Sequence, residues 1–134
     1  MPSIAILCGS FHAKEVEVML KEAEKTADKH GLDVEKIQWV PGSMEKPLAL
    51  KKLLQSKGID GAVVLGIIEK GETKHGLVMA HAVIKSIIEL ELEFMKPVGV
   101  GILGPEIEPH QIESRLKLYA HNAVNAVAEM LEQV

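Results

Sequence analysis

Segments of strand length and segments of helix length alternate along this chain, and this alternation limits the folds that it can adopt. Apolar runs with the length of buried strands lie at 3–8, 35–40, 61–68 and 97–103. Apolar residues recur at helical spacing in the segments that follow them, at 15–30, 46–57, 75–95 and 109–132. Such alternation predicts a parallel sheet with helices on both faces.

The third apolar run favours the same architecture, because its residues are apolar on both faces of the expected strand. This run, GAVVLGII at 61–68, suits a strand that is covered on both faces. We therefore predict an α/β fold, a flavodoxin-like three-layer α/β/α sandwich with a four-stranded parallel sheet of order 2-1-3-4. A chain of 134 residues without a linker or a repeat is expected to form a single domain over 1–134.

Composition excludes several classes of function. The net charge of −4 offers no field that would attract nucleic acid. The longest apolar stretch, at 62–68, is too short to span a membrane, and the amino terminus has no basic region typical of a signal peptide. The single cysteine, Cys8, forms no internal disulfide, which fits a reducing compartment. We expect a cytoplasmic protein without nucleic-acid or membrane partners.

Ligands of open parallel sheets bind beyond the carboxyl ends of the strands, so the residues there are the first candidates for a site. One segment leads from the third strand into the third helix and reads GIIEKGETKH at 66–75. Backbone N–H groups and the helix dipole at this junction favour an anion, while Glu72 and Thr73 fit a simple helix cap equally well. His75 begins the helix, where a histidine can exchange protons near neutral pH.

Three further residues have both a functional and a structural interpretation. Phe11 could stack on a flat heterocycle or fold onto the core. Glu45 could accept hydrogen bonds from substrate hydroxyls or supply charge at the start of a helix. Arg115, the only arginine in the chain, could bind a phosphate with both arms of its guanidinium or form a salt bridge with Glu113. The histidines and the cysteine lack metal-ligand spacing, so we expect no metal.

Taken together, four motifs resemble the lumazine synthase family along nearly the whole chain. Gly71-Glu72-Thr73-Lys74-His75 matches the family's Gly-Glu-Thr-x-His, and 40–47 matches its Val-Pro-Gly-x-x-Glu-x-Pro. Phe11 stands at the family's first-loop phenylalanine, and 111–115 matches its Gln-x-x-x-Arg. The Gly104-Pro105 pair and His81 look more like archaeal than bacterial members. Each motif alone is weakly specific, but the four in this order are a specific match.

The resemblance implies a transferase of riboflavin biosynthesis. The family condenses 5-amino-6-(D-ribitylamino)uracil with 3,4-dihydroxy-2-butanone 4-phosphate into 6,7-dimethyl-8-ribityllumazine, releasing phosphate and water, without a metal or redox cofactor. By this resemblance, His75 transfers protons. The implied substrate-binding residues are Phe11, Ser43, Met44, Glu45, Ile67, Ile68, Glu69, Glu72, Thr73, Val100 and Arg115. Phe11 stacks on the pyrimidine, 43–45 and the backbone of 67–69 hold its ring and ribityl chain, and Glu72, Thr73 and Arg115 hold the phosphate.

The helix at 75–95 carries more apolar residues than one sheet face requires, which predicts an interface with another subunit. One stripe contains Leu77, Ala80, Ile84, Ile87 and Ile88, and it is extended by Val78, Met79, Ala82, Val83 and Leu90. The resemblance implies a homo-oligomer, either a pentamer or a 60-subunit capsid of pentamers. In that ring, Phe11, Glu45 and His75 of one subunit face Val100 and Arg115 of the next.

Two other functions fit the same fold. One is the archaeal-type riboflavin synthase, a paralogue that lacks the Gly-Glu-Thr-x-His segment. The other is a non-catalytic flavin-binding, lumazine-binding or cage protein. The chain also departs from the family pattern: Val100 replaces an aromatic residue, His12 an asparagine and Lys46 an apolar residue, and a lysine common in the last helix of bacterial members has no equivalent.

Overall fold

A computed structural model describes residues 1–132 of the chain and contains four strands joined by helices. The strands are β1 (Ser3–Gly9), β2 (Asp33–Val40), β3 (Gly61–Glu69) and β4 (Val98–Ile107). The longer helices are α1 (Ala13–Lys29), α2 (Lys46–Leu54), α3 (His75–Phe94) and α5 (Leu116–Glu132). All neighbouring strands are parallel and lie in the order β2-β1-β3-β4, which confirms the predicted order and fold class.

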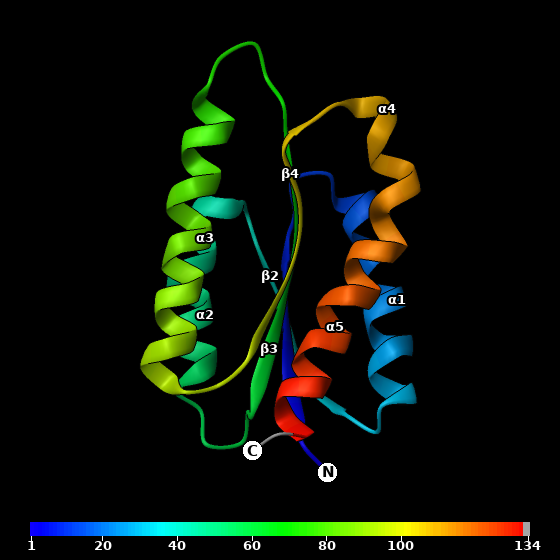
Figure 1. Cartoon of the computed structure of the whole chain (residues 1–134), viewed down its shortest axis with the longest axis vertical. Helices are drawn as coiled ribbons and strands as arrows, with labels where there is room; N and C mark the ends of the chain where they lie inside the picture. The colour runs from blue at the N-terminus through cyan, green and yellow to red at the C-terminus, as the bar shows by residue number, and fades with distance from the viewer. Residues whose placement is uncertain (133–134) are drawn as a thin grey trace.

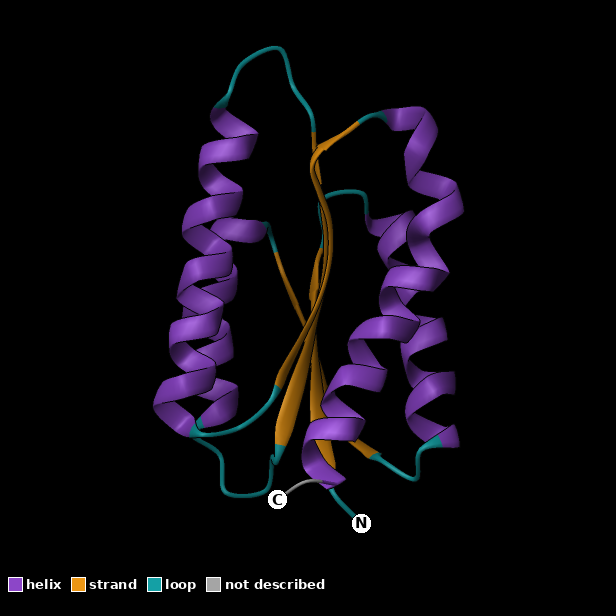
Figure 2. Cartoon of the chain, viewed as in Figure 1, coloured by secondary structure: helices purple, strands orange, loops and turns teal. Residues whose placement is uncertain are grey.

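The sheet lies between two layers of helices, as Figures 1 and 2 show. Helices α1 and α5 cover one face, and α2 and α3 cover the other. Alternate residues of β3 therefore point into different cores: Val63 and Leu65 contact the α1 and α5 layer, whereas Ala62 and Val64 contact the α2 and α3 layer. Every residue at 61–68 is buried, as the doubly apolar pattern predicted.

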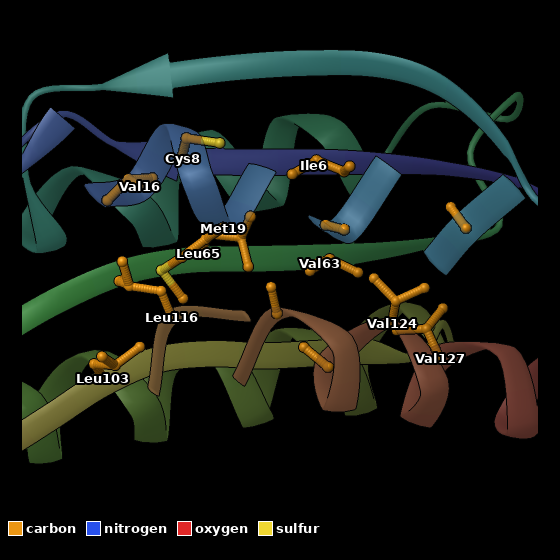
Figure 3. Close-up of a cluster of buried hydrophobic side chains, with 14 of the residues drawn as sticks. Ile6, Cys8, Val16, Met19, Val63, Leu65, Leu103, Leu116, Val124 and Val127 are labelled. Carbon is orange, nitrogen blue, oxygen red and sulfur yellow. The ribbon is translucent and has the colours of Figure 1, made fainter. Parts of the chain in front are cut away.

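The core between the sheet and the α1 and α5 layer is built from interdigitated aliphatic side chains, drawn in Figure 3. Ile6 and Val63 of the sheet belong to one cluster with Met19 of α1 and Val124 of α5, and all four are fully buried. Helix α5 can lie close to β4 because β4 has glycines on this face. A Cβ atom at Gly99 would collide with the backbone of Ala123 in α5.

Several element boundaries differ from the sequence-based prediction. The prediction that Gly104-Pro105 ends the fourth strand was wrong, because β4 continues to Ile107 through a bulge. The pairs Ile67–Leu103 and Glu69–Ile107 leave one residue of β3 opposite three residues of β4. The last helix, predicted as one element, is broken into α4 (Pro109–Ile112), a 3₁₀ turn η2 (Glu113–Arg115) and α5. Helix α2 ends at Leu54 rather than Lys57.

Helix α3 buries one stripe on the sheet and exposes apolar residues on its other side. The buried stripe is Ala80, Val83, Ile87 and Leu90, so the predicted stripe mixed residues from the two sides of the helix. Val78, Ile88 and Leu92 are exposed. Within residues 1–132, no helix has the length and apolar character needed to cross a membrane.

Lys46 is an unexpected member of the buried core. It is 1% exposed, and among the described residues no carboxylate lies within ion-pairing distance of it. Its Nζ lies 3.2 Å from the position that a Cβ atom would take at Gly9, and a Cβ at Gly66 would collide with the same nitrogen. Glycines near the carboxyl ends of β1 and β3 thus make room for the lysine. Burial lowers the pKa of Lys46 from 10.5 to about 8.

Replacing this lysine with methionine should stabilise the protein, because methionine fills similar space without a charge. Below pH 8 the Lys46 amine is charged in both the folded and the unfolded chain, so the free-energy cost of burying the charge is fully present. Between pH 8 and pH 10.5 only the unfolded chain keeps the proton, and the cost declines as pH rises. Lys46→Met should therefore raise the free energy of unfolding at pH 7 by on the order of 2–3 kcal/mol, and by progressively less toward pH 10.

The measurement is urea unfolding of both proteins at equal concentration, at pH 7 and at pH 9.5. Lys52→Met is the matched control, since Lys52 is an exposed residue of the same helix and its replacement should leave stability almost unchanged. A destabilised Lys46→Met protein, or a difference that does not vary with pH, would contradict this account of the buried charge.

Candidate active site

The carboxyl ends of β1, β2 and β3 surround a cavity of about 490 Å³. In Figure 1 this edge of the sheet is at the top, and both chain termini lie at the opposite end. The cavity gathers most of the residues predicted from the sequence: Phe11, Ser43, Met44, Glu45, Ile67, Ile68, Glu69, Thr73 and His75. Residues from three separate segments meet here because parallel strands bring their carboxyl ends to one edge.

One wall of the cavity comes from the segment after β2. Pro41 and Gly42 end the strand, and the chain then forms a 3₁₀ turn, η1 (Ser43–Glu45), before α2 begins. Ser43 is buried, whereas the Met44 side chain is 63% exposed at the mouth of the cavity. This wall therefore offers an apolar surface and a carboxylate side by side.

The floor comes from the end of β3, where the ladder to β4 is interrupted. The bulge in β4 leaves Ile68 opposite three residues, so its backbone is not engaged as in a regular ladder. Gly104, with a φ of +96°, approaches the Ile68 carbonyl so closely that a Cβ atom there would collide with it. On the other side of β3, the ladder to β1 ends at the pair Cys8–Leu65, so the backbone groups of 66–69 that face the cavity side have no partner in that ladder.

The opposite wall is the amino-terminal turn of α3. His75 begins the helix and is exposed to the cavity. Its backbone N–H donates to Thr73 Oγ1 at 3.3 Å, and Thr73 also lines the cavity, but the N-cap residue is Lys74, whose side chain makes no capping hydrogen bond. The other N–H groups of this first turn have no partner within the helix, and with the helix dipole they favour an anion. The predicted cap by Glu72 and Thr73 is therefore not formed, apart from the one hydrogen bond that Thr73 accepts from His75.

Three predicted site residues do not line this cavity: Glu72, Val100 and Arg115. Glu72 lies beside Thr73 in a separate small depression, which Lys70, Lys74 and Glu106 also line. Val100 is half-exposed on the edge strand β4. The cavity of one chain therefore contains most of the predicted site residues, but not Glu72, Val100 or Arg115.

Arg115 lies in η2, where its guanidinium is held by local contacts. Its Nη1 donates to the Gln111 carbonyl oxygen at 2.9 Å. Among residues 1–132 no carboxylate lies within ion-pairing distance of it, so the predicted alternative of a salt bridge with Glu113 is not formed. The remaining guanidinium donors are free to bind a ligand.

Cys8 plays no part in this chemistry. It is fully buried beneath the site, and burial raises the pKa of its thiol to about 12. A thiol that stays protonated near neutral pH is a poor nucleophile.

Several lining residues were not predicted from the sequence. Pro41, Gly42, Gly71, Gly76 and Met79 complete the cavity. Met79 follows His75 by one helical turn, so helical spacing could have placed it on the same face. A further unpredicted contact, between His12 and Glu69, connects the loop after β1 to the end of β3.

Known proteins resemble this chain over almost its whole length. The family model for 6,7-dimethyl-8-ribityllumazine synthase matches residues 2–134. A 6,7-dimethyl-8-ribityllumazine synthase from Picrophilus torridus is 39% identical over 132 residues, covering 98% of this chain and 96% of the relative. Relatives with the same name from Staphylothermus marinus and Saccharolobus solfataricus are 36% and 35% identical, covering 99% and 97% of this chain and 89% and 84% of their own lengths.

These relatives are archaeal, as the Gly104-Pro105 pair and His81 suggested, and their similarity extends over almost the whole chain. The resemblance drawn from the four motifs is confirmed, and the chain belongs to the 6,7-dimethyl-8-ribityllumazine synthase family.

Proposed function

We propose that this protein condenses 5-amino-6-(D-ribitylamino)uracil with 3,4-dihydroxy-2-butanone 4-phosphate into 6,7-dimethyl-8-ribityllumazine in the cytoplasm. The observation that carries this proposal is the single cavity in which Phe11, Glu45 and His75 meet at the carboxyl edge of the sheet. These residues come from three of the four motifs that resemble the family, and they supply an aromatic ring, a carboxylate and a proton-transfer group.

The chemistry requires orientation and proton transfer. The pyrimidine amino group attacks the ketone carbon of the sugar phosphate, and loss of water gives an imine. Loss of a proton next to the imine allows phosphate to leave. The enol that remains becomes a ketone beside the imine, the ribityl-bearing nitrogen attacks this new ketone carbon, and loss of another water closes the ring. Holding both substrates in a reactive geometry is worth roughly 7–11 kcal/mol in favourable cases, and proton transfer by His75 would add about 10²–10⁴-fold.

The substrates fit different parts of the site. Phe11 offers its face to the pyrimidine ring, and Glu45 with the backbone of Ile67 and Ile68 offers hydrogen bonds to the ring and the ribityl hydroxyls. The phosphate belongs at the amino-terminal turn of α3, beside Thr73, where backbone N–H groups are free. In this pose, His75 lies between the two substrates.

The position of Arg115 outside the cavity supports a site that is shared between two subunits. Val100 and Arg115 lie outside the cavity of their own chain, whereas a neighbouring chain in a closed ring would present them to it. The exposed residues Val78, Ile88 and Leu92 on α3 supply an apolar surface for such a contact. We include in the proposal a homo-oligomer, either a pentamer or a 60-subunit capsid of pentamers.

An assay with both substrates tests the function. Purified protein should produce the absorbance of 6,7-dimethyl-8-ribityllumazine and release one phosphate for each lumazine formed, faster than the uncatalysed mixture. An archaeal-type riboflavin synthase would instead convert added lumazine into riboflavin, and a cage or binding protein would bind lumazine without turnover. Either of the latter outcomes contradicts the proposal.

Arg115→Lys tests the phosphate role. Lysine keeps the positive charge but loses the planar fork that binds two phosphate oxygens at once. We expect KM for the sugar phosphate to rise about tenfold, while KM for the pyrimidine stays within about twofold. Lys117→Ala is the control, because it removes an exposed charge from the adjacent turn. Equal changes in both KM values, or no change in either, would remove Arg115 from the phosphate site.

A further inference from the structure

His12 connects the loop that carries Phe11 to the end of β3. Its Nε2 lies 2.8 Å from Glu69 Oε2, so an N–H there donates to the carboxylate, and its Nδ1 lies 3.8 Å from Glu15 Oε1. The His12 and Glu69 side chains are only 22% and 26% exposed. A charge-assisted hydrogen bond that is partly shielded from water is stronger than an exposed pair.

The backbone of His12 has an uncommon conformation at the start of α1. His12 is the N-cap of α1 and has a φ of 62°, in the left-handed region that residues other than glycine seldom adopt. Its carbonyl oxygen accepts the N–H of Val16 at 3.0 Å, which begins the helix. The loop therefore turns sharply at His12, and the contact with Glu69 holds the His12 side chain in place at this turn.

Phe11 lies between two anchor points. On one side, the Ser10 N–H donates to the Val40 carbonyl at 2.8 Å, and Ser10 Oγ donates to the Pro41 carbonyl at 3.2 Å, which ties the loop to the end of β2. On the other side is the contact of His12 with Glu69. The Phe11 ring itself is 60% exposed, so burial does not fix its direction. Its ring centroid lies 4.5 Å from that of His12 in an edge-to-face arrangement.

From this geometry we infer that His12 and Glu69 form a positioning pair, which holds the Phe11 ring over the cavity where the pyrimidine stacks. The inference rests on the proposed function and adds two side-chain roles to it. One oxygen of the Glu69 carboxylate is engaged by His12, so the side chain of Glu69 positions the loop while its backbone is offered to substrate. Because the sugar phosphate binds at the turn of α3, the pair governs affinity for the pyrimidine and leaves affinity for the phosphate unchanged.

The test is a double-mutant cycle with His12→Ala, Glu69→Ala and the combined variant, measured as KM for each substrate. Each single variant should raise KM for the pyrimidine about three- to tenfold and leave KM for the sugar phosphate within about twofold. The combined variant should be no worse than either single one, because the first change already breaks the pair. Glu69→Gln should retain most of the affinity, since its amide oxygen still accepts the His12 hydrogen bond.

His30→Ala is the matched control. His30 caps the other end of α1 and makes an equally short contact, with its Nε2 2.7 Å from Asn125 Oδ1, but it is remote from the cavity. It should change neither KM. Calorimetric titration with the pyrimidine alone should give the same ranking of variants as KM.

Additive effects of the two changes, parallel rises in both KM values, or no rise in KM for the pyrimidine would each overturn the inference. Failure of the proposed function is distinguishable, because it would appear in the unmodified protein as an absence of lumazine formation. In that case the calorimetric ranking of the variants still decides the role of the pair.

Discussion

Burial of β3 on both faces is the constraint on which the rest of the structure depends. Its apolar residues require a helical layer on each face of the sheet, and the connections between parallel strands contain the helices that form these layers. Every strand then ends at the same edge of the sheet. Loops that are far apart in the sequence, after β1, β2 and β3, therefore enclose one cavity. The site follows from this topology, while its specificity comes from the few side chains on these loops.

The glycines of the sheet adapt this framework to its contents. At one end, Gly99 lets α5 approach β4, and toward the site Gly66 and Gly9 leave space that the Lys46 side chain fills. An ammonium group buried without a carboxylate partner is costly to the folded state. Its position directly behind the wall formed by 43–45 links the stability of the core to the shape of the site. Such costs are commonly tolerated close to functional sites.

Much of the architecture could be predicted from the sequence, because strand and helix periods differ so clearly here. The order of the sheet and the clustering of Phe11, Glu45 and His75 followed from alternation and from four motifs. The bulge at Gly104-Pro105 could not be predicted, since a Gly-Pro pair is equally typical of a turn that ends a strand. The contact between His12 and Glu69 joins residues 57 positions apart and depends on a left-handed backbone at a non-glycine residue, which no local pattern indicates. Burial of Lys46 was likewise hidden, because lysine at a helix start is normally solvated.

In the function that we propose, a complete active site needs two chains, one giving His75 and the other Arg115. This claim is tested most directly by unfolding His75→Ala and Arg115→Ala proteins together, refolding the mixture and measuring lumazine formation. Random rings should carry both intact halves at about a quarter of their interfaces, and so regain activity that neither variant shows when refolded alone. If mass spectrometry finds mixed rings and activity remains at the level of the separate variants, the two residues do not meet at one site and the claim is wrong.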